Sequence, residues 1–131
     1  MKLAALFSGG KDSTYSIYKA KQMGHDVKCL ITLFPKSPNS HLLHFPNIKL
    51  TKLQSETMNI PHLVTELATD ETNQEMNALG ILLKKAKQDF QIDGLVHGGI
   101  SSEFQKKRFE NICKENDLNI LTPLWKTSPK E

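Results

Sequence analysis

The sequence predicts a doubly wound α/β fold, in which a parallel sheet of five strands carries helices on both faces. Short apolar runs alternate with amphipathic segments from one end of the chain to the other, and this alternation is typical of successive β-α-β units. Residues 27–34 are rich in Val, Ile and Leu on both faces, as strands buried inside a parallel sheet are. The 131 residues suffice for one domain with a substantial buried core.

The individual elements follow from the same alternation. The first helix is expected to stop at Met23 and Gly24, because a glycine past a helix end adopts the left-handed conformation easily. The stretch 35–47 contains three prolines and is expected to be a loop. The expected strands are 2–7, 27–34, 62–67, 94–97 and 119–124, and the expected helices are 11–22, 50–58, 73–90 and 102–115.

Two of these helices show which side chains they should bury. In the third helix, apolar residues recur at helical spacing and lysines occupy the opposite face. These apolar residues are Met76, Leu79, Leu82, Leu83, Ala86 and Phe90. For the last helix, the expected buried side chains are Phe104, Phe109, Ile112 and Cys113.

The most informative stretch joins the first strand to the first helix, and it reads Ser8, Gly9, Gly10, Lys11, Asp12 and Ser13. Adjacent glycines allow a tight turn that gathers backbone N–H groups around one point. The helix that begins there directs its free N–H groups and the positive end of its dipole toward the same point. Lys11 adds a cation, and the serines add hydroxyl donors. The stretch therefore predicts a site for a phosphate-bearing ligand rather than a plain glycine turn.

A second cluster follows the fourth predicted strand. Residues 98–102 again bring glycines and hydroxyls to the carboxyl end of a strand. Gln105 and Arg108 are three residues apart in the next helix, so they share one helical face. Arginine can fork onto a phosphate or carboxylate, and glutamine can orient a polar group. Taken alone, this segment is equally compatible with a capped surface helix whose polar side chains are solvated.

The first stretch is not a Walker A loop, because the required earlier glycine is missing and Asp12 follows the lysine. It resembles instead the PP-loop, SGGxDS, of the N-type ATP pyrophosphatases. Three further features narrow this resemblance to the diphthine–ammonia ligase family: a loop rich in Ser and His at 40–48, the motif GxIxSxFQKxRxExxC at 98–113, and Pro-Leu-Trp at 123–125. The resemblance covers nearly the whole chain. It implies a Rossmann-like fold of the adenine nucleotide alpha hydrolase type.

The resemblance also implies an activity, the ATP-dependent amidation of diphthine on elongation factor 2. ATP adenylates the diphthine carboxylate and releases pyrophosphate, and ammonia, supplied as ammonium, then displaces AMP to give diphthamide. The residues that match the ATP-binding motifs are Ser8, Gly9, Gly10, Lys11, Asp12, Ser13, Gly99 and Ser101. Lys11 and Asp12 are expected to act in catalysis, Asp12 by holding Mg²⁺ or by bracing the loop. The residues expected to contact the substrate or the adenylate are His44, Asn47, Gln105 and Arg108.

On the same resemblance, residues 1–127 are expected to form the PP-loop ATP-binding domain. Residues 128–131 read Ser-Pro-Lys-Glu, a helix start with proline at its first position. Because family members continue into a region that completes the substrate cleft, we expect 128–131 to be the start of that region, which this chain lacks. A frayed polar tail is the alternative interpretation.

The composition indicates which partners and which cellular compartment the protein is expected to have. The chain has 17 basic and 14 acidic residues, a balance too mild to require a nucleic-acid partner. Cys29 and Cys113 lie among apolar neighbours and form no CxxC pair, so we expect buried reduced thiols and a cytoplasmic protein. No apolar run approaches the length of a membrane span. The oligomeric state and the source of ammonia do not follow from the sequence.

Two other functions stay open on the sequence alone. A tRNA-modifying enzyme of the same superfamily would also adenylate its substrate, although the modest charge and the missing cysteine motif count against it. A nucleotide-binding module without catalysis would keep the phosphate-binding loop and have no acceptor to modify.

Overall fold

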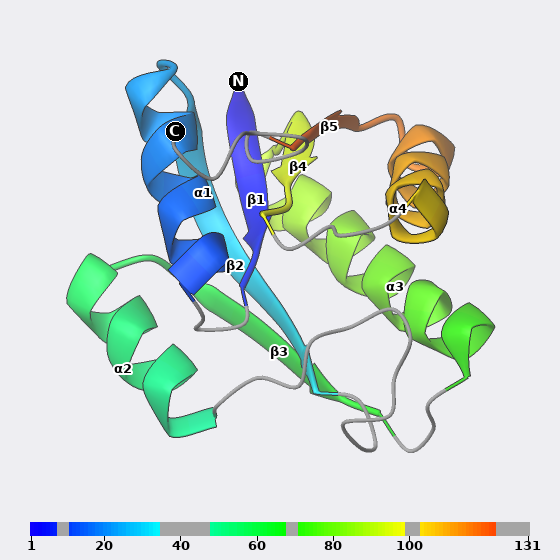
Figure 1. The fold of residues 1–131 in the computed structure, drawn as a ribbon, viewed down its shortest axis with the longest axis horizontal. Helices are drawn as coiled ribbons and strands as arrows, with labels where there is room; N and C mark the ends of the chain where they lie inside the picture. Colours follow the sequence, from blue (N-terminus) through cyan, green and yellow to red (C-terminus); the bar gives the residue numbers. More distant parts are fainter. Residues whose placement is uncertain (8–10, 35–47, 68–70, 99–102, 123–131) are drawn as a thin grey trace.

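The computed structural model describes residues 1–7, 11–34, 48–67, 71–98 and 103–122, with the backbone alone for 11–13, 48–50, 72 and 104 (Figure 1). It confirms the predicted Rossmann-like α/β fold with a five-stranded parallel sheet. In chain order the elements are β1 Lys2–Leu6, α1 Lys11–Gln22, β2 Asp26–Phe34, α2 Ile48–Met58, β3 His62–Glu66, α3 Thr72–Phe90, β4 Gly94–Val96, α4 Glu103–Glu115 and β5 Asn119–Leu121.

The predicted bounds agree closely with these elements. The first helix has the predicted bounds, whereas α2 begins at Ile48, two residues earlier than predicted. Strands β1, β3 and β4 each end one residue earlier than predicted. Strand β2 and helix α3 begin one residue earlier than predicted, and α4 begins one residue later. Strand β5 ends at Leu121, and the rest of its predicted extent beyond residue 122 lies outside the described residues, as does the predicted loop 35–47.

The sheet has the strand order β3-β2-β1-β4-β5. From β1 the chain proceeds through β2 to β3 at one edge, and then crosses back to β4 on the other side of β1. In the registers, Leu3 is opposite Gly94 between β1 and β4, and Leu30 is opposite His62 between β2 and β3. Helices α1 and α2 lie on one side of the sheet and α3 and α4 on the other (Figure 1). The protein therefore has three layers.

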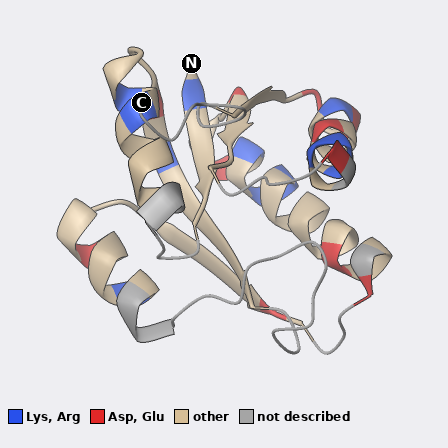
Figure 2. Cartoon of the chain, in the orientation of Figure 1, with Lys and Arg blue, Asp and Glu red and all other residues tan. Residues whose placement is uncertain are grey.

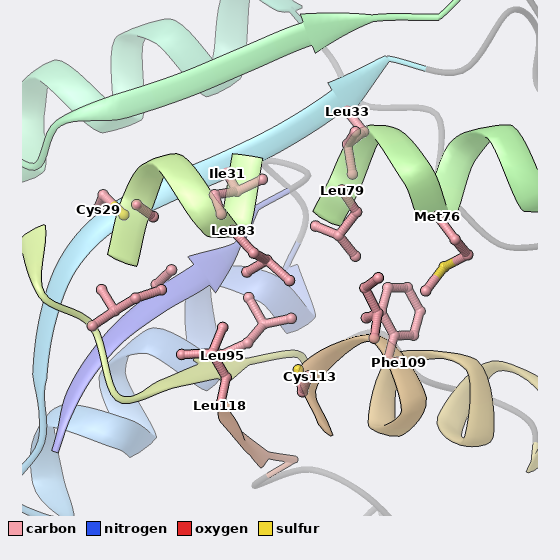
Figure 3. Close-up of a cluster of buried hydrophobic side chains, with 14 residues drawn as sticks. Cys29, Ile31, Leu33, Met76, Leu79, Leu83, Leu95, Phe109, Cys113 and Leu118 are labelled. Carbon is pink, nitrogen blue, oxygen red and sulfur yellow. The ribbon is translucent and has the colours of Figure 1, made fainter. Parts of the chain in front are cut away.

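The alternating side chains of β1 and β2 divide the core between the two faces. Ala4 and Ile31 belong to the cluster that packs against α3 and α4, whereas Leu3, Ala5 and Leu30 belong to the cluster on the α1 side. Figure 3 shows β2, α3 and α4 contributing side chains to the first cluster. Successive strand residues point to opposite faces, so both faces of these strands are buried.

The predicted buried faces of α3 and α4 are confirmed where side chains are described. The α3 residues that are buried in the core are Met76, Leu79, Leu83 and Ala86, with Leu82 and Phe90 partly buried against it. The buried α4 residues are Phe109, Ile112 and Cys113. The side chain of Phe104 lies outside the described residues. Lys84, Lys85 and Lys87 of α3 are exposed, as the predicted opposite face requires.

The predicted glycine stop of α1 is also confirmed. Gly24 has a φ of 89°, which is in the left-handed region that glycine adopts without a steric cost. The N–H of Gly24 donates to the carbonyl of Lys21, and the N–H of His25 donates to the carbonyl of Ala20. These two bonds satisfy carbonyls at the helix end and turn the chain into β2.

Gly94 should not tolerate a side chain. A Cβ at this position would lie 2.8 Å from the backbone oxygen of Asn119 and 3.0 Å from Cδ2 of Leu3. We expect Gly94→Ala to lower the free energy of unfolding by about 1–3 kcal/mol, because two paired strands would have to move apart. Urea denaturation followed by circular dichroism measures this change.

Gly80→Ala is the matched control for that substitution. A Cβ at Gly80 would lie 3.2 Å from the flexible end of the Ile112 side chain, and alanine favours the helix over glycine by about 1 kcal/mol. We therefore expect Gly80→Ala to be close to neutral or stabilising. Equal destabilisation by both substitutions would contradict the close β1-β4-β5 packing.

Candidate functional site

The candidate site lies where the carboxyl ends of β1 and β4 leave the sheet. These two strands are neighbours, but the chain leaves β1 for α1 on one face and leaves β4 for α4 on the other. The order of strands in the chain reverses between them. In open α/β sheets, such switch points are where ligands bind, because the two diverging loops leave a crevice. The two stretches singled out in the sequence therefore follow adjacent strands.

The first stretch enters α1. Helix α1 begins at Lys11, so the backbone of Lys11, Asp12 and Ser13 forms its first turn. These residues carry N–H groups that have no acceptor inside the helix, at the positive end of the dipole. This placement agrees with the predicted phosphate site. Ser8, Gly9 and Gly10, and the side chains of the first three helical residues, lie outside the described residues.

The second stretch leads from β4 to α4. Gln105 and Arg108 lie in the first two turns of α4 and are half-buried. The guanidinium Nη1 of Arg108 donates to Oδ1 of Asn73 at 3.5 Å, which places Arg108 at the junction of α4 and α3. Arg108 is therefore not a fully solvated surface side chain. That Gln105 and Arg108 contact a ligand stays a prediction.

The other predicted site residues cannot be compared with the structure. Gly99 and Ser101 of the second stretch lie outside the described residues, as do His44 and Asn47 of the loop after β2. The prediction that Asp12 holds Mg²⁺ depends on a side chain that is also not described. In the parts of the chain that are described, no group of three or more His, Cys, Asp or Glu side chains is arranged to hold a metal ion.

The structure adds His97, which the sequence analysis did not single out. Its ring is 6% exposed and lies edge-on to the ring of Phe109, with ring centroids 4.3 Å apart. The N–H of His97 donates to the carbonyl of Leu121 at 3.0 Å. His97 thus joins the end of β4 to both β5 and α4, immediately before the second stretch. Its position at the end of a strand and next to two glycines was a signal available in the sequence.

Glu75 is the second addition. It is 1% exposed although it carries a carboxylate, and it lies in the first turn of α3. Its spacing of four residues from Leu79 places both on one helical face. The apolar periodicity of α3 therefore extends to this position, but the sequence analysis did not single it out, because glutamate is almost never fully buried.

Thr32 and His62 form the third addition, at the carboxyl half of β2 and the start of β3. The Oγ1 of Thr32 donates to the carbonyl of Phe7 at 2.6 Å, and Nε2 of His62 lies 2.6 Å from the same Oγ1. Desolvation by burial, with a smaller contribution from the nearby charge of Lys52, lowers the pKa of His62. Thr32 stands in an otherwise apolar run, and a buried hydroxyl needs a hydrogen-bond partner.

The lowered pKa of His62 predicts a loss of stability in acid. Below about pH 6.5 an unfolded histidine binds a proton that folded His62 resists, so the unfolded state binds more protons and the free energy of unfolding falls as the pH falls. Urea denaturation at about pH 7.5 and about pH 5.5 is expected to show a smaller loss for His62→Gln than for the unmodified chain. Equal losses would contradict this assignment.

Charges on the helices near the site are mixed in sign. The described parts of α3 and α4 each carry both basic and acidic residues (Figure 2). Lys106 and Glu110 form an ion pair one helical turn apart, at 3.6 Å. A mixture of both charge signs on one helix is typical of a solvated helix face.

Both cysteines are buried free thiols, as predicted. Burial raises the pKa of Cys29 and of Cys113 to about 12. At neutral pH each is therefore a protonated, inaccessible side chain of the core. None of the described helices combines the length and the apolar character that crossing a bilayer requires.

The fold and its switch point define the class of protein: a doubly wound α/β protein with a candidate anion site at the start of α1. Comparison with known families gives a more specific assignment. Residues 1–120 match the model of the diphthamide synthase N-terminal domain. The chain belongs to this family, which confirms the resemblance stated from the sequence.

Individual relatives agree with the family. The chain is 28% identical to the diphthine–ammonia ligase of Homo sapiens and 30% identical to that of Mus musculus, each over 148 aligned positions that cover all of this chain and 55% of the relative. It is also 37% identical to a tRNA-specific 2-thiouridylase of Campylobacter jejuni over 75 positions, which cover 56% of this chain and 21% of that enzyme. The chain thus spans about half the length of the ligases it matches.

Proposed function

We propose that this chain is the ATP-binding part of a diphthine–ammonia ligase, and that it adenylates the carboxylate of diphthine on elongation factor 2. The observation that carries the proposal is that β1 and β4 are neighbouring strands. Residues 8–13 and the stretch that contains Gln105 and Arg108 therefore follow the carboxyl ends of adjacent strands. Membership of the diphthamide synthase N-terminal domain family and the ligases among the relatives support it.

In the proposed reaction, a carboxylate oxygen of diphthine attacks the α-phosphorus of ATP. The bond between the α-phosphorus and the bridging oxygen to the β-phosphate breaks, and pyrophosphate leaves with the electron pair. Ammonia then attacks the acyl carbon, AMP leaves, and one proton is lost as the amide forms. The chemistry depends mostly on positioning and charge stabilisation.

The chain's own residues have distinct roles in this proposal. Residues 8–13 hold the β- and γ-phosphates through backbone N–H groups, with Lys11 stabilising the departing pyrophosphate. Gly99 and Ser101 face the nucleotide. Asp12 supplies the carboxylate oxygen that Mg²⁺ prefers and is the residue that would hold this ion, which neutralises phosphate charge when bound.

The acceptor side is assigned to the second stretch and the loop after β2. Gln105 and Arg108, half-buried at the start of α4, contact the substrate or the adenylate, together with His44 and Asn47. Arg108 contacts Asn73 of α3 at 3.5 Å, and its guanidinium can bind a carboxylate or phosphate through two parallel hydrogen bonds. We propose that residues 1–127 form this ATP-binding domain, that a further region completes the acceptor cleft, and that the protein works in the cytoplasm, where reduced thiols persist.

The test is a product analysis with diphthine-bearing elongation factor 2, ammonium and ATP–Mg²⁺. The murine ligase, which contains the aligned segment and further chain, serves as the positive control beside this chain. Release of AMP and pyrophosphate that depends on both the acceptor and ammonium is the expected result. Release of ADP would contradict adenylation. If this chain binds ATP but shows no turnover even when joined to the remaining region of the murine ligase, a nucleotide-binding module without catalysis is favoured.

A second candidate, adenylation of tRNA for thiolation, is favoured by the partial match to a 2-thiouridylase. The cysteines count against it, because a thiol that carries sulfur must be accessible and deprotonated. Both thiols here are buried, with pKa values raised to about 12. Protection of bound tRNA from nuclease by this chain would support the second candidate, and absence of protection would support the first.

A further inference from the structure

A chain of hydrogen bonds links three neighbouring strands just before residues 8–13, the stretch proposed to bind the phosphates. It runs from His62 of β3 to Thr32 of β2 and then to Phe7, the residue that follows β1. Both contacts are 2.6 Å long, which is short for protein hydrogen bonds. Thr32 is 1% exposed, so water does not compete for its hydroxyl.

The direction of each bond follows from the available protons. The carbonyl of Phe7 can only accept, so the single hydroxyl proton of Thr32 is donated to it. The Thr32 oxygen must then accept from His62, which requires a proton on Nε2 of the imidazole. His62 therefore holds the Thr32 hydroxyl in the one rotation that points to Phe7.

Phe7 is held in three ways at the point where the chain leaves the sheet. Its N–H donates to the carbonyl of Ile31 at 2.8 Å. Its ring is 1% exposed and lies edge-on to the ring of His62. Its carbonyl accepts from Thr32. Because a peptide unit is planar, fixing this carbonyl sets the plane of the peptide bond through which the chain enters residues 8–10.

We infer that Thr32 and His62 are positioning residues for the triphosphate of the nucleotide: they orient the carbonyl of Phe7, and with it the peptide bond to Ser8, the first residue of the stretch proposed to bind the phosphates. The inference rests on the proposed function of that stretch. The sheet itself does not require a hydroxyl here, because every other residue of 29–34 is apolar and a valine would fill the same space. The hydroxyl instead donates to the carbonyl of Phe7, the last residue before the proposed phosphate-binding stretch.

The test compares nucleotide binding by Thr32→Val and Thr32→Ser, using calorimetric titration with ATP–Mg²⁺ and with AMP. Valine keeps the shape and removes both hydrogen bonds, whereas serine keeps the hydroxyl. We expect Thr32→Val to weaken ATP binding by about 5–20-fold, as the loss of a buried hydrogen bond implies, with a smaller loss for AMP. Thr32→Ser is expected to bind ATP with an affinity within about twofold of that of the unmodified chain.

Ile92→Val provides a matched control for stability. Ile92 is 2% exposed and precedes the amino end of β4, away from the carboxyl ends of the strands, so its truncation lowers stability without changing Thr32, His62 or Phe7. We expect it to leave ATP binding unchanged. If Thr32→Val does not fold, His62→Leu removes the donor to Thr32 and is expected to weaken ATP binding in the same way, with His62→Gln restoring it.

The outcomes separate this inference from the proposed function. If the unmodified chain binds no ATP, the proposed function fails. If it binds ATP and Thr32→Val binds equally well, the inference is overturned and the proposed function stands. The inference is also overturned if Ile92→Val weakens binding as much as Thr32→Val, or if ATP and AMP are affected equally, because the effect would then be one of general stability.

Discussion

Replacing Phe109 with alanine is expected to lower the free energy of unfolding by about 3–5 kcal/mol, the usual cost of removing a buried aromatic ring. Phe109 is fully buried, belongs to the core cluster between the sheet and α3 (Figure 3), and contacts the ring of His97. The cavity would open between α4 and His97, the residue that follows β4. Because whole domains are stable by about 5–15 kcal/mol, the variant should be near the limit of folding.

Two further variants make this prediction specific. Phe109→Leu fills most of the space and is expected to cost less than Phe109→Ala. Tyr18→Ala also removes an aromatic ring, but Tyr18 is 57% exposed on α1, so its effect should stay within about 0.5 kcal/mol. Urea denaturation of the three variants measures these differences. A small loss for Phe109→Ala would mean that α4 does not pack on β4 through this ring.

Replacing Lys11 with alanine is expected to weaken ATP binding by about 10–100-fold, which corresponds to one charge-assisted contact of about 1.4–2.8 kcal/mol. Lys11 is the first residue of α1, where its positive charge would add to that of the helix dipole. Calorimetric titration with ATP–Mg²⁺ measures the change. The free energy of unfolding should change by less than about 1 kcal/mol, because a single charge in the first turn of a helix contributes about 0.3–1 kcal/mol through the helix dipole.

Lys21→Ala is the control for charge. Lys21 lies in the last turn of the same helix and is exposed, so the substitution changes the net charge equally at the far end of α1. We expect ATP binding to change by less than about twofold, because the charge lies beyond a Debye length from the helix start. If both lysine variants bind ATP equally well, the loop does not hold the phosphates in the proposed way.

The motif that follows β4 has two parts with different tasks. Phe109, Ile112 and Cys113 are core residues, so their part of the motif stabilises the packing of α4 on the sheet. Gln105 and Arg108 lie nearer the start of the helix and are half-buried. Substitutions in the first part should therefore change stability, and substitutions in the second part should change ligand binding.

The fold was largely predictable from the sequence because hydrophobic periodicity reports local structure. The apolar positions of α3 predicted both the helix and its buried face, and Gly24 predicted where α1 ends. The start of α2 at Ile48 is two residues earlier than predicted. Bounds depend on the last hydrogen bonds of an element, which periodicity does not report.

The candidate site was predictable only in part. Two local stretches could be identified, because glycines, hydroxyls and a helix start lie together in the sequence. The adjacency of β1 and β4 could not be read from the residues, since Leu3 and Gly94 are distant in the chain. The contact between Thr32 and His62 likewise depends on the register of β2 against β3, which no local pattern determines.

The most direct test of the central claim is hydrogen exchange of the backbone amides with and without ATP–Mg²⁺. The claim is that the carboxyl ends of β1 and β4 hold the nucleotide between them. It predicts slower exchange for the first turn of α1, from Lys11 to Thr14, and for His97 and Gly98, where the chain leaves β4. It predicts no change at the amino ends of the strands, around Asp26 and Asn119. Protection confined to any other part of the chain, or no protection at saturating ATP, would contradict the claim.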